Sequence, residues 1–173
     1  MRKLLRPPEL IEDPWRYAGE EPGAGAPAVA PTAGAHAGGI IVALATFLAD
    51  PVAWADQPVG VRVAPGDRVE DLAPHLPRLG LVAIEFPGPG EGRGYTCARL
   101  LRQRYGFAGE VRAVGPAVRQ DLLFFMARCG FDSFELAPGE DAAQALQALS
   151  RYTLAYQRGV PYPPVREARF SAP

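Results

Sequence analysis

Short apolar runs alternate with longer segments of helical periodicity through residues 40–156. A run of four to six apolar residues is typical of a buried strand, whereas apolar positions three and four residues apart are typical of a helix. The runs that predict strands are GIIVAL (39–44), VGVRV (59–63), LVAIEF (81–86), EVRAVG (110–115) and SFEL (133–136). This alternation predicts an α/β fold of repeated βα units around a mainly parallel sheet of four to five strands.

The segments between the runs predict helices with recognisable ends. The helix after residue 44 is expected to break near Pro51, and Asp67 followed by Glu70 has the spacing of a capping box. Gly106 and Gly130 are placed to end the next two helices. The helix before Gly130 carries an apolar stripe that is expected to be buried: Val118, Leu122, Phe125, Met126 and Cys129. The sheet is expected to be either flavodoxin-like and open or a partial TIM-like barrel. Both architectures bind ligands at the carboxyl ends of the strands.

The pattern divides the chain into three parts. Residues 1–39 form an N-terminal extension, residues 40–156 the α/β domain, and residues 157–173 an extended, proline-rich tail. Within the extension, residues 4–17 predict a short pair of strands. Residues 18–39 consist mostly of Ala, Gly and Pro, which is typical of a flexible linker.

Charge and composition narrow the classes of partner. The formal net charge of −1 gives no reason to expect nucleic acid or a membrane as partner. Ile40–Ala49, the longest apolar run, is too short to cross a bilayer, and the N-terminus lacks the apolar core of a signal peptide. We therefore expect a cytoplasmic protein. Cys97 and Cys129 lack the spacing of zinc or iron–sulfur ligands, so we expect no metal site, and the sequence leaves the cofactor unknown.

The glycine-rich loop GPGEGRGYTC (88–97) is one candidate for chemistry. Its glycine spacing differs from both the dinucleotide fingerprint and the Walker A loop. It nevertheless opens a predicted helix, whose first N–H groups could hold an anion with Arg93 as a clamp. The candidate anion-binding residues of the loop are Gly92, Arg93, Gly94 and Tyr95. The alternative is a glycine-rich sharp turn.

A second candidate is the set of charges inside the predicted strands, Arg62, Glu85, Arg112 and Glu135. The signs alternate from strand to strand, and a charge in a buried strand requires a partner. One interpretation is an internal ladder of ion pairs. The other is a polar site in which Arg62 and Arg112 bind an anion while Glu85 or Glu135 acts as an acid–base catalyst. Both interpretations require the four side chains to share one face of the sheet.

A third candidate is Cys97, near the start of the helix that follows the glycine loop. Arg93 and Arg99 lie close to it in the sequence, and cations together with a helix N-terminus lower the pKa of a thiol. Cys97 is thus the better candidate for a reactive thiol, with a small core residue as the alternative. Arg99, Arg102 and Arg104 are most simply a solvated basic face of the same helix.

Residues 59–156 resemble a bacterial family of unknown function, domain-of-unknown-function family 934. The resemblance lies in VGVRVAPGDRVEDLAPHL, in QDLLFFMARCGFDSFEL and, most specifically, in GRGYTCARLLRQRYGFAGEVRAVG. Members of the family are typically encoded beside assimilatory sulfite reductase and are often labelled oxidoreductases of sulfite reduction. The resemblance implies a role in sulfur assimilation but supplies no catalytic residues.

Two functions remain open. The first is a small enzyme or ligand-binding domain for an anion such as sulfite. The second is a non-enzymatic accessory protein that docks on a sulfite-assimilation enzyme through the acidic N-terminus, the basic Arg99–Arg104 helix or the tail. The edges of an open sheet also make a homodimer a reasonable expectation.

Overall fold

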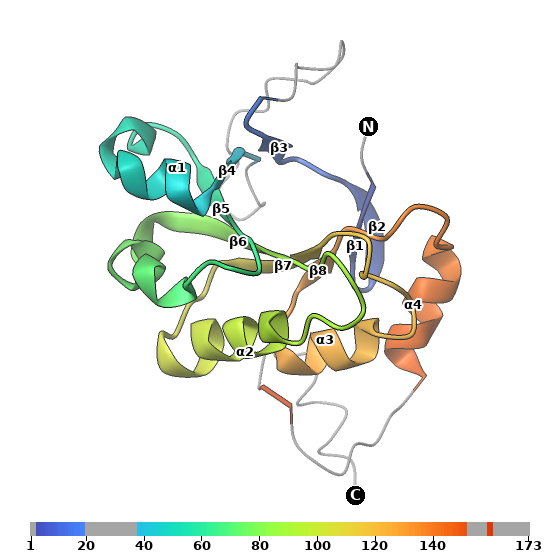
Figure 1. The fold of residues 1–173 in the computed structure, drawn as a ribbon. Coiled ribbons are helices and arrows are strands. Elements are labelled where there is room, and N and C mark those ends of the chain that lie inside the picture. The colour runs from blue at the N-terminus through green and yellow to red at the C-terminus, as the bar shows by residue number, and fades with distance from the viewer. Residues whose placement is uncertain (1–2, 20–37, 152–158, 161–173) are drawn as a thin grey trace, which may run out of the picture.

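The computed structural model describes residues 3–19, 38–151 and 159–160. Its centre is a curled sheet of eight strands in the order β2-β1-β8-β7-β6-β5-β4-β3 (Figure 1). The strands are β1 (Lys3–Arg6), β2 (Glu9–Glu12), β3 (Arg16–Tyr17), β4 (Ile40–Ala43), β5 (Val59–Val63), β6 (Leu79–Glu85), β7 (Glu110–Val114) and β8 (Ser133–Phe134). Strands β3 to β8 are parallel to one another, and β1 is antiparallel to both β8 and β2.

The sheet is larger than the four to five strands predicted from the sequence. The five predicted strands are present as β4 to β8, and the N-terminal extension adds the predicted β1–β2 pair together with β3. The parallel strands lie side by side in chain order. This order differs from that of a flavodoxin-like sheet, in which the first strand lies inside the sheet. It is the order in which the strands of a barrel follow one another.

The N-terminal segment joins the two ends of the sheet. Strands β2 and β3 are the outermost strands, yet only residues 13–15 separate them in the chain. Four residue steps span at most about 14 Å, so the sheet must curl until its ends lie close together. Figure 1 shows the chain passing from β2 to β3 along one side of the sheet. The hydroxyl of Tyr17 in β3 also donates a hydrogen bond of 3.1 Å to Glu135, just after β8.

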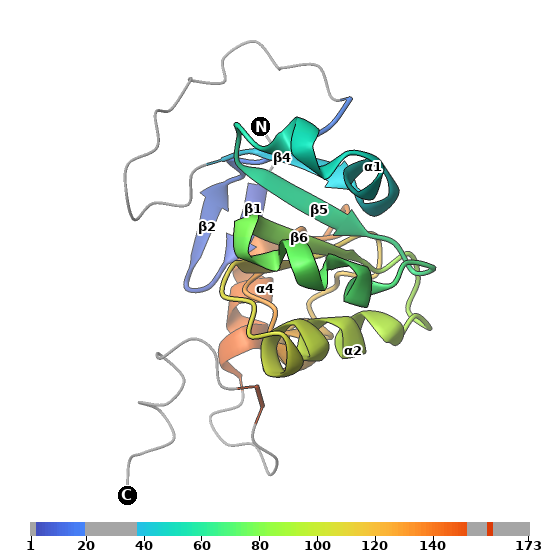
Figure 2. The same ribbon diagram turned by 90° about the vertical axis from the view of Figure 1, so that its left-hand side faces the viewer.

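Helices cover the outer face of the curled sheet (Figure 2). They are α1 (Leu44–Ala49), the 3₁₀ segments η1 (Pro51–Trp54) and η2 (Val69–Arg78), α2 (Arg93–Arg99) with its π-helical continuation η3 (Leu100–Arg104), α3 (Leu123–Cys129) and α4 (Ala142–Ser150). The main core lies between these helices and the sheet. It includes the outward-facing strand residues Val61, Val82, Ile84, Val111 and Phe134 together with Phe47, Leu72, Leu101 and Met126 from the helical layer.

The helix breaks predicted near Pro51, at Gly106 and at Gly130 are confirmed, but the capping box at Asp67 is wrong. The Asp67 carboxylate accepts a hydrogen bond of 2.8 Å from the N–H of Ala64, and it does not cap η2. Pro74 and Pro77 lie inside η2 and lack the N–H groups that a continuous α-helix needs. The segment therefore folds as tight 3₁₀ turns.

Two further expectations about helices are wrong. Helix α3 begins only at Leu123, so Val118 and Leu122 precede the helix that was predicted to carry them, while Phe125 on the same stripe is 53% exposed. Arg102 is buried and does not lie on a solvated face. Its guanidinium donates hydrogen bonds to the carbonyls of Phe107, Gly109 and Gly130, and it pairs with Asp132. This arginine therefore ties the end of the helix to two loops.

Parts of three predicted segments lie outside the described residues. These are the linker from residue 20 to 37, the end of the closing helix from 152 to 156, and most of the tail. Within the described part of the chain, every helix is too short or too polar to cross a membrane.

Candidate functional site

The four charges predicted to form a site lie on the inner face of the curled sheet. Arg62 is paired with Ala83, and Ala83 with Arg112, so these residues share one face across β5, β6 and β7. Glu85 lies two residues beyond Ala83, and Glu135 lies two residues beyond Ser133, the partner of Arg112 in β8. Side chains alternate between faces along a strand, so the condition that both interpretations require is met.

The charges nevertheless differ in exposure, and Arg112 is the enclosed one. Its side chain has no exposed surface. It donates hydrogen bonds of 2.9 and 3.0 Å to Glu110 and one of 2.8 Å to Asp13. The hydroxyl of Ser133 also donates to Glu110, at 2.5 Å. The guanidinium is thus held between two buried carboxylates, and in this arrangement no ligand from solvent reaches it.

The indole of Trp15 fills the inner face beside this network. Three glycines make room for it: ideal Cβ atoms at Gly39, Gly60 and Gly80 would lie 2.7, 3.2 and 3.0 Å from its ring. The remaining contacts are apolar and come from Ile41, Leu81, Ala83 and Val114. The inner face is therefore filled by the N-terminal segment of the same chain.

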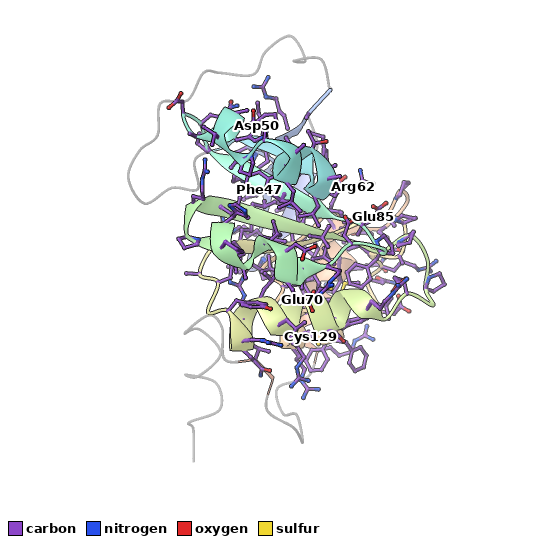
Figure 3. The ribbon with its side chains drawn as sticks, turned by 60° about the vertical axis from the view of Figure 1, so that its left-hand side comes forward. Phe47, Asp50, Arg62, Glu70, Glu85 and Cys129 are labelled. Atoms are coloured by element: carbon purple, nitrogen blue, oxygen red, sulfur yellow. The ribbon has the colours of Figure 1, made fainter. Side chains whose placement is uncertain are left out.

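The other three charges and Tyr17 form a polar group toward the carboxyl ends of the strands, which we call the mouth: Tyr17, Arg62, Glu85 and Glu135. Arg62 contacts Glu85 at 2.7 Å from Nη2 and at 3.1 Å from Nε, and Figure 3 shows the two side chains beside each other. The hydrogen bond to Glu85 raises the pKa of Arg62 above its usual value, and the charges of Tyr17 and Glu135 add to this rise. The mouth thus combines one cation, two carboxylates and a phenol, from β3, β5, β6 and the residue that follows β8.

The mouth is open to solvent in a way that Arg112 is not. The Arg62 side chain is 44% exposed and that of Glu85 is 20% exposed. Tyr17 and Glu135 are half-buried. The charged groups are therefore accessible, while Ala83 and Val114, the register partners of Arg62 and Glu85, are buried.

In the glycine loop, the positions that an anion would occupy are taken by a carboxylate of the chain itself. The guanidinium of Arg93 donates two hydrogen bonds of 3.0 Å to Glu91, and the Arg93 N–H donates a third of 3.0 Å. These bonds lower the pKa of Glu91. Gly94 serves a packing role, since a Cβ there would lie 2.5 Å from the ring of Phe86. Tyr95 packs edge-on against the same ring and is half-buried.

A cavity of about 360 Å³ separates the glycine loop from the loop that follows β5. Its charged lining includes Asp67, Glu70, Glu85, Glu91, Arg68 and Arg93, so carboxylates outnumber arginines. Cys97 also lines the cavity, and Figure 3 shows Glu70 on the neighbouring segment η2.

The expected lowering of the Cys97 pKa is wrong. Burial raises the pKa of the thiol, and the charge of Glu70 adds to this rise, while Arg93 opposes it. Burial also raises the pKa of Cys129. Both cysteines are free. Among the residues that the structure describes, no group of three His, Cys, Asp or Glu side chains is arranged to hold a metal ion.

Sequence reasoning missed three residues of this inner face: Asp13, Trp15 and Tyr17. They come from an extension whose pattern indicates only a short strand pair, and nothing local shows that it crosses the sheet. Three glycines at the starts of neighbouring strands, Gly39, Gly60 and Gly80, are the one sequence signal that a bulky side chain lies against them.

Together these features define a mixed α/β protein with a curled, mostly parallel sheet and a polar mouth at its carboxyl edge. A family model described as a bacterial protein of unknown function, DUF934, matches residues 60–165, which is more than half of the chain. The chain belongs to this family. None of the curated proteins matches it.

Proposed function

We propose that this protein is a ligand-binding domain of sulfite assimilation and that its mouth binds a small ligand carrying an anionic group. The link to sulfite assimilation comes from the family resemblance described above. The location comes from the fold, because parallel α/β sheets bind ligands at the carboxyl ends of their strands. Arg62 is the group that would bind the anion.

The observation that carries the proposal is the state of Arg62. Its Nε and Nη2 both contact one oxygen of Glu85, and Nη1 makes no hydrogen bond within the described part of the chain. The guanidinium is therefore fixed by Glu85 while part of it remains accessible. A fixed guanidinium loses little side-chain entropy when it binds a carboxylate or a sulfur oxyanion.

The other predicted arginines are less suitable. Arg112 is enclosed, and Arg93 is occupied by Glu91 through both its side chain and its N–H. A simple anion at the glycine loop would have to displace that carboxylate. Arg93 therefore serves as the comparison in the test.

The test is the shift in melting temperature caused by sulfite, sulfate, phosphate and small carboxylates. Wild type is expected to be stabilised by at least one of them, and Arg62→Gln is expected to lose this stabilisation. Arg119→Gln removes an arginine that is 61% exposed elsewhere on the surface and should leave the shift unchanged. If Arg93→Ala removes the shift and Arg62→Gln does not, the glycine loop is the site. If wild type is not stabilised by any anion, the proposal is refuted.

A second candidate function is docking on a sulfite-assimilation enzyme, and a specific surface favours it. Phe125 is 53% exposed and packs edge-on against Phe124, whose ring lies 5.6 Å from the guanidinium carbon of Arg128. Helix α2 and its continuation add exposed Arg99 and Arg104 to the same helical layer. Exposed aromatic residues next to arginines are typical of protein interfaces.

Docking is tested by pull-down of the sulfite reductase from the same host. Wild type is expected to retain the enzyme, Phe125→Ser to lose it, and Arg62→Gln to keep it. Retention by Phe125→Ser would exclude this surface. Loss with Arg62→Gln would instead connect the interaction to the mouth.

A further inference from the structure

We infer that a partner protein docks on the outer face of α2 and η3 through an acidic segment, whose carboxylates pair with Arg99 and Arg104. This inference rests on the docking candidate of the proposed function, and it gives the chemistry of the partner at that surface. It does not depend on the mouth.

A cavity lies against this helix face. Its volume is about 460 Å³, and the described residues that line it are Thr96, Arg99, Leu100, Gln103 and Arg104. Their spacing, three residues and then one, is that of a single helix face. The lining thus offers two guanidinium groups, a hydroxyl, an amide and one apolar side chain, and the described part of it contains no carboxylate.

The charge of this face is not balanced by the chain. Neither Arg99 nor Arg104 forms an ion pair within the part of the chain that the structure describes. Residues 92–109 contain no Asp or Glu, and the preceding carboxylate, Glu91, is held by Arg93. A positive surface of this kind attracts a partner of opposite charge and selects against a basic one.

The π-helical turn brings the two arginines toward one side. Residues five apart in an α-helix point in directions that differ by about 140°. In η3 the N–H of Tyr105 bonds to the carbonyl of Leu100, five residues earlier, at 3.0 Å. The wider turn places residues five apart closer to the same face, and Arg99 and Arg104 have this separation and line the same cavity. Two carboxylates of one segment can therefore reach both guanidinium groups.

An apolar contact completes the surface. Leu100 is half-buried in the lining, and Phe125 of α3, the neighbour of α2 in the helical layer (Figure 1), is 53% exposed. Burial raises the pKa of the Cys129 thiol and the charges of Arg99 and Arg128 oppose this rise, so Arg99 lies close to the end of α3. Phe125 lies one helical turn before Cys129. An acidic segment that also carries an apolar side chain fits this surface.

The same features favour a protein partner over a nucleic acid. A nucleic acid carries a phosphate at every nucleotide and is bound by several cations along its path. The cavity offers two arginines, and the carboxylate of Asp121, which is 70% exposed, lies just before α3.

The experiment selects peptides from a random library displayed on phage against the immobilised full-length protein. A parallel selection uses the double variant Arg99→Gln, Arg104→Gln, which is expected to fold because both side chains are exposed. Peptides selected on wild type are expected to be richer in Asp and Glu and to contain an apolar residue. Equal acid content in the two selections, or a wild type that selects no peptide, overturns the inference.

Fluorescence anisotropy with the most enriched peptide then measures affinity. The double glutamine variant is expected to bind about tenfold more weakly, because two exposed ion pairs are lost, and the affinity of wild type should fall as salt is added. Arg99→Lys, Arg104→Lys keeps both charges and should retain most of the affinity. Arg119→Gln, which removes a 61% exposed arginine elsewhere, is the matched control and should bind like wild type. Equal losses in the lysine and glutamine variants would contradict charge pairing.

Further outcomes separate this inference from the proposed function. If the peptide binds but the sulfite reductase is not retained in the pull-down, the acidic contact stands and that enzyme is not the partner. If the enzyme is retained equally by wild type and the double glutamine variant, docking stands and the acidic contact is overturned. Loss of the peptide in Arg62→Gln would place it at the mouth and overturn the inference.

Two other occupants of the surface are tested with the same variants. A single-stranded RNA oligonucleotide that binds more tightly than the peptide, and loses affinity in the double glutamine variant, would show that the surface recognises phosphate. A dimer of wild type in sedimentation that the double glutamine variant abolishes would show that a second copy covers the surface. Either result overturns the inference.

Discussion

Replacing Arg112 with methionine is expected to destabilise the protein more than any other single charge removal on the inner face. Methionine keeps the length and apolar volume of the side chain but removes the guanidinium. Three hydrogen bonds of 2.8–3.0 Å are lost, and the carboxylates of Asp13 and Glu110, which are 1% and 2% exposed, lose the Arg112 guanidinium.

The expected magnitude follows from that isolation. Removing one partner of a buried ion pair costs about 3–5 kcal/mol, because the remaining charge is neither solvated nor paired. For a domain of this size the loss corresponds to a fall in melting temperature of roughly 10–15 °C. Removing all three charges together should destabilise the protein less, because neutral side chains are buried at a lower cost in free energy than an unpaired charge. The triple variant Asp13→Asn, Glu110→Gln, Arg112→Met should therefore recover at least about half of the loss.

The assay is urea denaturation followed by tryptophan fluorescence, with Trp15 reporting on the inner face. Arg119→Met is the matched control: its side chain is 61% exposed and its nearest carboxylates are 3.8 Å away, so the free energy of unfolding should change by less than about 0.5 kcal/mol. A loss below about 1 kcal/mol for Arg112→Met would refute the reasoning, as would a triple variant less stable than Arg112→Met.

Three further predictions concern other parts of the fold. Gly80→Ala places a Cβ 3.0 Å from the ring of Trp15 and should lower the free energy of unfolding in urea by about 1–3 kcal/mol. Gly90 has open space around it, so Gly90→Ala should leave the free energy of unfolding nearly unchanged. Equal effects of the two substitutions would contradict the packing of Trp15 against Gly80. Burial raises the pKa of Asp132 to about 6, so the native state binds this proton more tightly than the unfolded state does. As the pH rises from 4 to 6, the free energy of unfolding of wild type should therefore fall by at most about 3 kcal/mol. Asp132→Asn should reduce this pH dependence. An unchanged pH dependence in Asp132→Asn would show that Asp132 is not the group responsible. The raised pKa of Cys97 predicts that iodoacetamide alkylates this thiol slowly at pH 7.5, measured in the variant Cys129→Ser. An alkylation rate above that of free cysteine would contradict the raised pKa.

The α/β class and its parallel strands could be predicted from the sequence because each strand is a separate apolar run. The two-residue strand β8 was found in this way although it is short. Pairing the strands in chain order was one of two open alternatives, because local periodicity does not specify which strands are neighbours. The strand order of the structure decides between them.

The candidate site was predictable only in part. One charge in each apolar run identified Arg62, Glu85, Arg112 and Glu135 as a set that had to share a face, and the strand register meets this condition. Their exposure had no such signal: Arg62 and Arg112 both pair with Ala83, yet Arg112 is enclosed by partners from elsewhere, including Asp13, which lies 99 positions away in the chain. Such a contact has no signal in a single sequence.

The direction of the Cys97 pKa shows a similar limit. Arg93 and Arg99 are its neighbours in the sequence, yet Arg93 is held by Glu91, and Glu70 lies close to the thiol in space. Burial and a carboxylate from η2 therefore outweigh the nearby arginines. The charges adjacent in the sequence predicted a lowered Cys97 pKa, whereas the pKa depends on the groups that surround the thiol in the folded protein.

The most direct test of ligand binding at the mouth is an NMR titration of the arginine Nε–Hε resonances with sulfite, sulfate, phosphate and small carboxylates. The Arg62 resonance is assigned by its absence from Arg62→Gln. We predict that it shifts with saturation, while the resonance of the enclosed Arg112 stays in place. Arginine resonances that remain fixed at the highest soluble ligand concentration, or a shift of Arg93 in place of Arg62, would contradict binding at the mouth.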